Sequence, residues 1–402
     1  MAGLRLQLAS IRKIGARLIE NRQFAASTAK MMIARVAHQV HMPAPDRAGK
    51  IGQVSIRITD HCNLRCHTCG QWGDNGYLHN VPIKELSARE IPTERYIELL
   101  TDLHKHGHRP GLYLWGGEPM LYKGSVDLFE AAAKLGMPGS IATNGSRVAE
   151  NAERLVEAPL FLLQASIDGP TAEVHNACRP GAGLRSDNFA VVNRGLDEIR
   201  RVREERGRKL PIVAALCTIN NLNYDRLVET YDNFRDKVDM FVFYLAWWID
   251  DESADQHTED FKHRFGFEPT LHKGWVGGWL PPDFKVLSDQ LNEVAKRGLK
   301  GSEPAVFIVP PFTEPADLER YYTDHSSLFG FKKCVSIYRM VEIDSNGDMS
   351  PCRDYHDYVV GNVKDHTITE LWNNAMYSKF RGSLKTDGLM PVCTRCCGLM
   401  GN

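Results

Sequence analysis

Hydrophobic and polar positions follow helical and strand periods in alternation between residues 92 and 246. Residues 92–106 carry apolar side chains at helical spacing, which predicts an amphipathic helix. The apolar face of this helix comprises Tyr96, Leu99, Leu100 and Leu103. The short apolar segment 111–115 then predicts a strand. The same patterns predict further helices and strands in turn, namely helices 124–135, 147–157, 187–205 and 223–236 and strands 139–143, 160–167, 211–218 and 239–246.

A strand before residue 60 completes a regular order of six strands with intervening helices. Short apolar strands that are buried on both faces are typical of a parallel sheet. Right-handed crossover connections curl such a sheet into a barrel, with the chemistry at the carboxyl ends of the strands. We therefore expect an α/β protein built on a partial (β/α)6, TIM-like barrel.

Three cysteines lie close together directly after the first predicted strand, at Cys62, Cys66 and Cys69. Three thiolates can bind three irons of a cubane iron–sulfur cluster and leave the fourth iron open for a small molecule. Structural zinc sites usually have four protein ligands. His67 could supply a fourth ligand, so a zinc knuckle is the alternative interpretation.

The predicted strand 111–115 is followed by Gly116, Gly117, Glu118 and Pro119, which alone indicate only a tight turn. Placed one helix after a cysteine triplet, this segment resembles the radical S-adenosylmethionine (radical SAM) superfamily. The resemblance covers residues 50–310 and implies the partial barrel of that family. It also implies that the triplet holds a [4Fe–4S] cluster, and that the strand end at residues 116–119 contacts the methionine amino group of S-adenosylmethionine.

The resemblance implies a radical chemistry. In this family the cluster reductively cleaves S-adenosylmethionine, and the resulting 5′-deoxyadenosyl radical abstracts a hydrogen atom from the substrate. The cofactors carry the difficult chemistry, while the protein supplies positioning and excludes water. A reductant protein such as flavodoxin or ferredoxin is the implied electron donor.

Residues at successive strand ends surround the cofactor in this family. Carried over to this sequence, Asn144 and Ser166 are candidates for contacts to its ribose and methionyl groups. Arg179 lies in a segment that begins at His175 and resembles the family's His-x-x-x-Arg, so its guanidinium is expected to bind the methionine carboxylate bidentately. The alternative for each residue is a helix cap or a surface ion pair. Asp168 is expected to cap the next helix instead.

One position departs from the family pattern. An aromatic residue usually precedes the third cysteine and packs beside the adenine, whereas this chain has Thr68 there. Trp72, in the following loop, could replace it. Thr68 at this position weakens the assignment of the adenine site. It does not affect the assignment of the cluster to the three cysteines.

Residues 247–283 differ from the barrel in composition. This segment holds four of the seven tryptophans, with acids and histidines between them, namely Trp247, Trp248, Asp250, Asp251, Glu252, His257, His272, Trp275 and Trp279. It is either a surface insertion with a small core of its own or a lid over the barrel mouth. A lid predicts a pocket bounded by the first cluster, Tyr244 and this segment, in which an acid or a histidine accepts the substrate's proton.

The last third of the chain holds a second group of cysteines. Cys334 is followed by twelve residues, Gly347, four residues and Cys352, and a predicted hairpin with an Asn-Gly turn lies between the cysteines. Three more cysteines follow near the C-terminus, at Cys393, Cys396 and Cys397. The spacing resembles the SPASM and twitch extensions of radical SAM enzymes, so residues 311–402 are expected to form a small auxiliary domain.

Five cysteines suit the shorter twitch form, which has one auxiliary [4Fe–4S] cluster. The resemblance implies Cys334, Cys352, Cys393 and Cys396 as its ligands, with Cys397 able to replace Cys396. A zinc ribbon is the alternative, because four thiolates also suit zinc. A fully ligated cluster can accept an electron from a substrate radical after proton loss, and an incompletely ligated one could instead bind substrate.

These features favour a radical SAM oxidoreductase that dehydrogenates a small polar metabolite, such as an aminosugar or a cyclitol. Its alternative is the modification of a ribosomally made peptide by cross-linking, epimerisation or maturation. The segment before the barrel looks too short and too helical for a winged-helix peptide-recognition domain, which favours the small molecule. A non-catalytic iron–sulfur or zinc protein is a third reading, against which the Gly-Gly-Glu-Pro segment argues.

Charge and composition limit the classes of partner and the compartment that we expect for this protein. The chain has 402 residues and a net charge of −1, so no basic excess points to nucleic acid. No apolar run approaches the length of a membrane span. Clustered cysteines indicate metal ligands in a reducing compartment rather than disulfides, so a cytoplasmic protein is expected.

The N-terminal extension 1–49 is basic and has apolar residues at helical spacing, namely Leu4, Leu8, Ile11, Ile14 and Leu18. It could be an organelle targeting peptide or a membrane-surface helix. We expect a helix that packs against the barrel.

Overall fold

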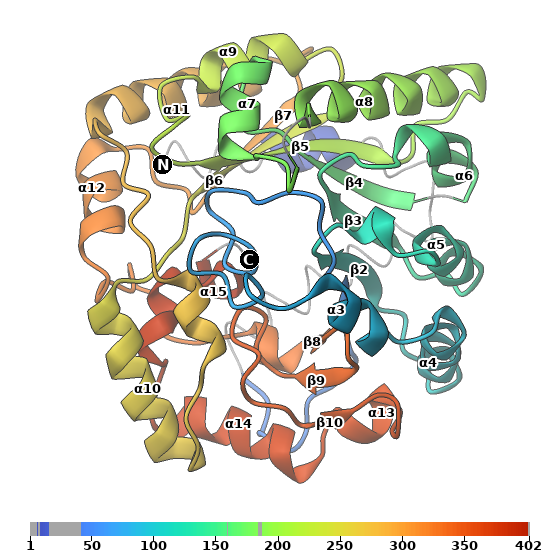
Figure 1. The fold of residues 1–402 in the computed structure, drawn as a ribbon, viewed down its shortest axis with the longest axis vertical. Helices are drawn as coiled ribbons and strands as arrows, with labels where there is room; N and C mark the ends of the chain where they lie inside the picture. The colour runs from blue at the N-terminus through green and yellow to red at the C-terminus, as the bar shows by residue number, and fades with distance from the viewer. Residues whose placement is uncertain (1–5, 7–8, 16–41, 159, 184–186, 401–402) are drawn as a thin grey trace.

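A computed structural model describes residues 6, 9–15, 42–158, 160–183 and 187–400. These residues are built around one curved sheet of ten strands in the order β10-β9-β8-β1-β2-β3-β4-β5-β6-β7 (Figure 1). The strands are β1 (Gln53–Thr59), β2 (Gly111–Gly116), β3 (Gly139–Thr143), β4 (Leu160–Ser166), β5 (Ile212–Ile219), β6 (Met240–Leu245), β7 (Ala305–Val309), β8 (Met340–Ile343), β9 (Asp348–Ser350) and β10 (Gly361–Asn362).

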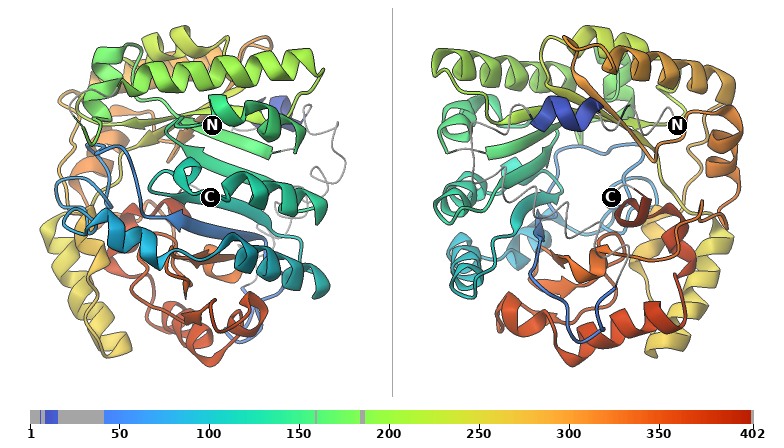
Figure 2. Two further views of the ribbon diagram at one scale, coloured as in Figure 1. Left: turned by 45° about the vertical axis from the view of Figure 1, so that its right-hand side comes forward. Right: turned by 180° about the vertical axis from the view of Figure 1, so that it is seen from behind.

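Every neighbouring pair from β8 through β1 to β7 is parallel. Helices connect these strands and cover the outside of the sheet, and the sheet does not close (Figure 2). The outer helices are α4 (Thr93–Lys105), α5 (Ser125–Lys134), α6 (Ala152–Glu157), α7 (Ala172–Cys178), α8 (Asn188–Glu205), α9 (Leu227–Phe234), α11 (Phe284–Gly298) and α12 (Pro315–Thr323). The predicted partial barrel, with its six strands and the order of its elements, is confirmed.

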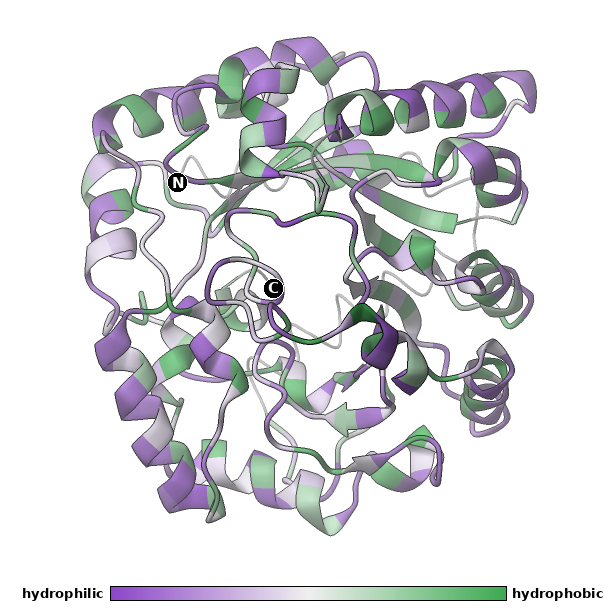
Figure 3. Cartoon of the chain, viewed as in Figure 1, coloured by the Kyte–Doolittle hydropathy of each residue, from purple (hydrophilic) through white to green (hydrophobic). Residues whose placement is uncertain are grey.

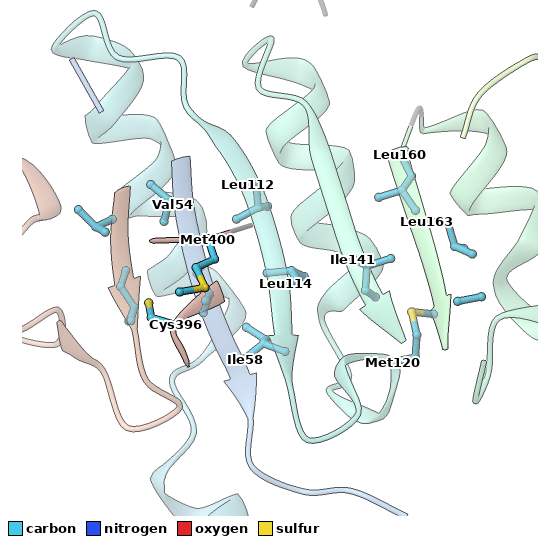
Figure 4. Close-up of a cluster of buried hydrophobic side chains, with 14 of the residues drawn as sticks. Val54, Ile58, Leu112, Leu114, Met120, Ile141, Leu160, Leu163, Cys396 and Met400 are labelled. Atoms are coloured by element: carbon cyan, nitrogen blue, oxygen red, sulfur yellow. The ribbon is translucent and has the colours of Figure 1, made fainter. Parts of the chain in front are cut away.

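The main core lies between the sheet and these helices. Residues of β1 to β4 that point outward from the barrel are buried there, as Figure 4 shows for Val54, Leu112, Leu114, Ile141 and Leu163. The predicted apolar face of α4 packs into the same layer, with Tyr96, Leu99, Leu100 and Leu103 at most 1% exposed. The outer helices therefore carry both hydrophobic and hydrophilic residues along their length (Figure 3). Burial of one face of each helix stabilises the barrel wall.

The C-terminal region extends the sheet of the barrel. The predicted hairpin forms from β8 and β9, with Glu342 opposite Ser350, and Gly347 takes φ +92° in its turn. The sequence pattern did not predict that β8 also pairs in parallel with β1, with Gln53 opposite Met340. This pairing satisfies backbone groups that would otherwise lie at an open sheet edge beside β1.

The remaining helices lie around the barrel mouth and the C-terminal region. They are α3 (Ile83–Arg89), α10 (Asp251–Phe265), α13 (Ile368–Leu371), α14 (Ala375–Thr386) and α15 (Cys397–Met400). α10 packs against the C-terminal region, since Phe265 stacks on Phe380 at 5.6 Å between ring centroids and Arg264 donates a hydrogen bond to the Gly388 carbonyl at 2.9 Å. Among the helices that the structure describes, none has the length and apolar character of a membrane span.

Part of the predicted N-terminal helix is described, and it packs on the barrel. Ser10 Oγ donates to the carbonyl of Val306 in β7 at 2.7 Å, and Lys13 Nζ donates to the Gly298 carbonyl at 2.7 Å. Leu6 is buried against the same side. Leu4, Leu8 and Leu18 of the predicted pattern lie outside the described residues.

Candidate functional site

The first cysteine group lies in the loop that follows the carboxyl end of β1. The backbone N–H of Leu64 donates to Cys62 Sγ and that of Trp72 to Cys69 Sγ, both at 3.4 Å. The end of α7 holds the loop in place, because Cys178 accepts a hydrogen bond from the His67 N–H at 2.9 Å. Burial raises the pKa of the Cys62 thiol, and the hydrogen bond from Leu64 partly offsets this by favouring the thiolate form that binds metal.

All three cysteines line one cavity of about 260 Å³, here called the cofactor cavity. The structure brings most of the sequence-predicted cofactor residues to the same cavity, namely Gly116, Gly117, Glu118, Asn144, Ser166 and Arg179. Pro119 is the exception, because it is buried in the 3-10 turn Pro119–Leu121 that follows.

Two tight backbone approaches hold the cysteine loop against the end of β2. The Gly117 N–H donates to the Thr59 carbonyl at 2.8 Å, and the Glu118 N–H donates to the His61 carbonyl at 2.8 Å. Gly116 has φ +128°, where residues with a Cβ are strained. A Cβ on Gly117 would overlap the carbonyl oxygen of His61. Both glycines are therefore required so that the strand end can lie directly against the residues before Cys62.

We expect Gly117→Ala to separate β2 from the cysteine loop. Overpacking of this kind costs about 1–3 kcal/mol, so the free energy of unfolding in denaturant should fall by that amount, and iron bound after anaerobic reconstitution should fall with it. Gly382→Ala in α14 is the matched control, since an added Cβ there meets nothing within 4 Å. Wild-type stability and iron content in Gly117→Ala would contradict this interpretation.

Glu118 fixes the ends of β2 and β3 relative to each other. Its carboxylate accepts hydrogen bonds from Thr143 Oγ1 at 2.6 Å and from the Asn144 N–H at 2.7 Å. Burial raises the pKa of Glu118 to about 7, although these hydrogen bonds lower it. The Glu118 carboxylate thus fixes this part of the cavity wall through hydrogen bonds to the end of β3.

Asn144 and Ser166 lie at the predicted strand ends. Asn144 Nδ2 donates to Asn63 Oδ1 at 2.9 Å and thereby ties the end of β3 to the cysteine loop. Ser166, the last residue of β4, lines the cofactor cavity and also the chamber described below.

Arg179 is buried beside the cysteines. Its Nε forms an ion pair of 2.6 Å with Asp168 Oδ2, and its Nη1 donates to Cys66 Sγ at 3.7 Å. With side chains 13% and 2% exposed, this is not a surface ion pair. Asp168 was expected to cap the following helix, and that expectation is wrong, because Thr171 caps α7. Asp168 instead faces the buried guanidinium, where its charge is compensated.

The aromatic residue proposed to replace Thr68 also faces the cofactor cavity. Trp72 is 3% exposed, and its Nε1 donates to the Asp60 carbonyl at 2.8 Å. The Arg65 guanidinium lies 4.0 Å from the centre of the indole ring. Thr68 lines the same cavity, so both positions meet there.

A second cavity of about 450 Å³, here called the barrel chamber, adjoins the first. Alternate residues of β2 to β6 point into it, namely Tyr113, Trp115, Ser140, Ala142, Leu162, Gln164, Ser166, Leu216, Thr218 and Tyr244. Most of these side chains were missed from the sequence. The available signal was a single polar residue inside an otherwise apolar strand, as with Ser140 and Gln164, because alternate residues of a strand face opposite sides of the sheet.

The segment 247–283 supplies one wall of this chamber. Trp247 and Trp275 stack with ring centroids 3.9 Å apart and line both cavities. A Cβ on Gly70, next to Cys69, would overlap the Trp275 ring, so this tryptophan lies directly on the cysteine loop. Phe261 of the same segment joins the buried core instead. The segment therefore combines a chamber wall with a hydrophobic core, and Tyr244 borders the chamber as the lid hypothesis requires.

Four C-terminal cysteines line a third cavity, which is almost entirely apolar and is here called the auxiliary cavity. They are Cys334, Cys352, Cys393 and Cys396, as the sequence predicted. Burial raises the pKa of Cys393 to about 12, and the neighbouring Cys334 adds to this effect. Burial likewise raises the pKa of Cys334 and that of Cys352. Thiols gathered in one dry cavity suit a metal or cluster that keeps them deprotonated. The side chain of Cys397 lies outside the described residues.

In the described part of the chain, no three Cys, His, Asp or Glu side chains converge as they would around one metal ion. A zinc ion requires four ligands at about 2.0–2.3 Å from a single centre. A cubane binds each thiolate through a different iron, so its cysteines line a cavity rather than meet at a point. Both cysteine groups have this cavity-lining arrangement.

A buried ionic network joins the two cysteine regions. Arg57 of β1 pairs with Asp60 at 2.9 Å and with Asp344 at 3.0 Å, and His356 Nδ1 lies 2.8 Å from Asp344. Burial lowers the pKa of His356, but the charge of Asp344 and its hydrogen bond to the ring together contribute to a net rise. The network fixes the start of the first cysteine loop against the C-terminal region.

Two family models match the chain. Residues 56–234 match the radical SAM superfamily, and residues 334–397 match SPASM, an iron–sulfur cluster-binding domain. Together they cover more than half of the sequence. The first match spans the triplet and β1 to β5, and the second spans all the auxiliary cysteines.

Relatives of similar length extend these matches. An AdoMet-dependent heme synthase of Methanosarcina barkeri is 24% identical over 349 residues, which are 85% of this chain and 87% of that protein. A tungsten-containing aldehyde ferredoxin oxidoreductase cofactor-modifying protein of Pyrococcus furiosus is 23% identical over 371 residues, covering 85% of this chain and 86% of that protein. The structure of Streptococcus suis SuiB bound to S-adenosylmethionine shares the fold, with a TM-score of 0.54 and 15% identity over 86% of this chain and 72% of that chain.

Proposed function

The chain belongs to the radical SAM superfamily and carries a SPASM domain, and on that premise we propose that it is an oxidoreductase that dehydrogenates a small polar metabolite bound in the barrel chamber. One observation carries the proposal. The chamber shares Cys69 with the cofactor cavity and Arg353 with the auxiliary cavity. A molecule in the chamber therefore lies between the two cysteine groups.

Each cavity is assigned a role from its lining. Cys62, Cys66 and Cys69 hold a [4Fe–4S] cluster, and Cys334, Cys352, Cys393 and Cys396 hold the auxiliary one. When bound, S-adenosylmethionine and the first cluster supply the radical that removes a hydrogen atom from the substrate. The residues at 116–118 shape the cavity wall, and Arg179, held between Asp168 and Cys66, orients the methionine carboxylate.

The chain's own groups complete the oxidation. A dehydrogenation that begins with loss of a hydrogen atom must still release one proton and one electron from the substrate. Asp354 lines the chamber and is 7% exposed, so its carboxylate is the candidate acceptor for the proton. A cluster held by the four C-terminal cysteines would accept the electron, and Arg353 lines the wall that the chamber shares with the auxiliary cavity. Trp247 and Trp275 exclude water while the radical exists.

The chamber supports a small substrate. Its volume of about 450 Å³ lies in the range of small-molecule sites, and its lining combines aromatic with hydrogen-bonding side chains such as Trp115 and Gln164. The two relatives that match most of this chain are named for heme synthesis and for modification of a cofactor, which supports a small-molecule substrate. An aminosugar or a cyclitol is the class we favour, and a ribosomally made peptide is the alternative.

The proposed cofactors also indicate an electron donor and a cellular compartment. Two reducible clusters require a low-potential electron donor, for which flavodoxin or ferredoxin is the proposed partner. Ten cysteines, most of them gathered at the two proposed cluster sites, favour the reducing cytoplasm.

Filling the chamber tests the proposal. We expect Leu162→Trp to abolish formation of oxidised product from a panel of aminosugars and cyclitols, because the larger side chain occupies the chamber. Leu162 does not line the cofactor cavity, so 5′-deoxyadenosine formation under strong reductant should persist. Leu299→Trp, at a residue 49% exposed, is the control. If peptides turn over and the panel does not, the small-molecule proposal is wrong.

A further inference from the structure

One histidine from outside the C-terminal region enters the auxiliary cavity. His257 lies on α10, is 1% exposed and lines this cavity together with the four cysteines. Among the described residues, neither Nδ1 nor Nε2 of its ring has a hydrogen-bond partner. Because buried polar groups in proteins are almost always hydrogen-bonded, two unpartnered nitrogens on a cavity wall indicate a partner inside the cavity.

The neighbours of this imidazole are other rings. His272 lies 4.8 Å away between ring centroids, Phe261 5.5 Å and Tyr355 5.9 Å. His272 Nε2 lies 3.2 Å from the Ala254 carbonyl, and its Nδ1, like both nitrogens of His257, has no hydrogen-bond partner among the described residues. The packing holds the His257 ring in place without using its polar atoms.

We propose that His257 is a positioning residue that donates a ring N–H hydrogen bond to a sulfur atom of the auxiliary cluster. The inference rests on the proposed cluster at the four C-terminal cysteines. An imidazole carries at least one N–H donor in either protonation state. A hydrogen bond to a cluster sulfur stabilises the more negatively charged, reduced form, and therefore raises the reduction potential.

The hydrogen bond gives α10 a function in electron transfer. α10 belongs to the segment whose Trp247 and Trp275 close the barrel chamber. Arg264, two turns after His257, donates to the Gly388 carbonyl at 2.9 Å and anchors the same helix to the region before Cys393. The segment 247–283 thus supplies a wall of the chamber and also sets the reduction potential of the auxiliary cluster.

The test measures the potential of the auxiliary cluster alone. Full-length protein with Cys62, Cys66 and Cys69 all changed to alanine is reconstituted anaerobically with iron and sulfide, then titrated with reductant and followed by electron paramagnetic resonance. In this background we expect His257→Phe to keep its iron and to disfavour reduction about tenfold, which corresponds to about 59 mV for one electron. His257→Gln retains an N–H donor and should keep most of the original potential.

His325→Phe is the matched control. His325 is also a buried histidine, at 6% exposed, but it packs on Trp248 and does not line the cavity. The inference is overturned if His257→Phe leaves the potential unchanged, if His325→Phe lowers it equally, or if the Phe and Gln variants at position 257 both lose iron. Absence of iron from the background protein itself would instead refute the proposed auxiliary cluster.

Discussion

Replacement of Cys62, Cys66 and Cys69 together by alanine should abolish reductive cleavage of S-adenosylmethionine. These thiols line the cofactor cavity, where backbone N–H groups and Arg179 are directed at their sulfur atoms. Alanine provides no ligand, so no cluster forms to deliver the electron. Production of 5′-deoxyadenosine by anaerobically reconstituted protein with dithionite, measured by chromatography, should fall to the level without protein.

The iron content of the same variant provides an internal control. It should retain about four irons, the number in one cubane, if the auxiliary cysteines hold the second cluster. Near-wild-type thermal unfolding would show that the barrel remains folded. Undiminished 5′-deoxyadenosine formation would refute the assignment of the triplet, and a single bound zinc without iron would refute that of the auxiliary cluster.

The barrel was predictable because its signals are local. Helical spacing in 92–106 and the apolar segment 111–115 each determine one element, and alternation of such elements leads to a parallel sheet. The cofactor cavity was predictable for a related reason. Carboxyl ends of parallel strands meet at one edge of the sheet, so Glu118, Asn144 and Ser166 lie together although they are far apart in sequence.

What could not be predicted depends on contacts between distant segments. The pairing of β8 with β1 requires two strands almost three hundred residues apart, and neither strand alone indicates its partner. Asp168 has the sequence position of a helix cap, but its carboxylate forms a buried ion pair with an arginine eleven residues later instead of capping the helix. The Trp275 ring packs on Gly70, and neither segment has a hydrophobic periodicity that would predict this contact.

Loss of the auxiliary cluster should separate cofactor cleavage from substrate oxidation. We expect Cys334→Ser combined with Cys393→Ser to lose about four irons, because both thiols line the auxiliary cavity. The cofactor cavity shares no cysteine with it, so 5′-deoxyadenosine should still form.

The oxidised product should nevertheless disappear from this double variant. Abstraction of a hydrogen atom leaves a substrate radical in the chamber, and the variant removes the acceptor beyond Arg353 for its remaining electron. With substrate deuterated at the reacting carbon, deuterium should still enter 5′-deoxyadenosine, which shows that abstraction persists. Cys217→Ser, at a buried cysteine that lines neither the auxiliary cavity nor the chamber, is the control. Unchanged product formation by the double variant would show that the electron leaves by another route, and that the C-terminal cysteines serve the fold rather than the reaction.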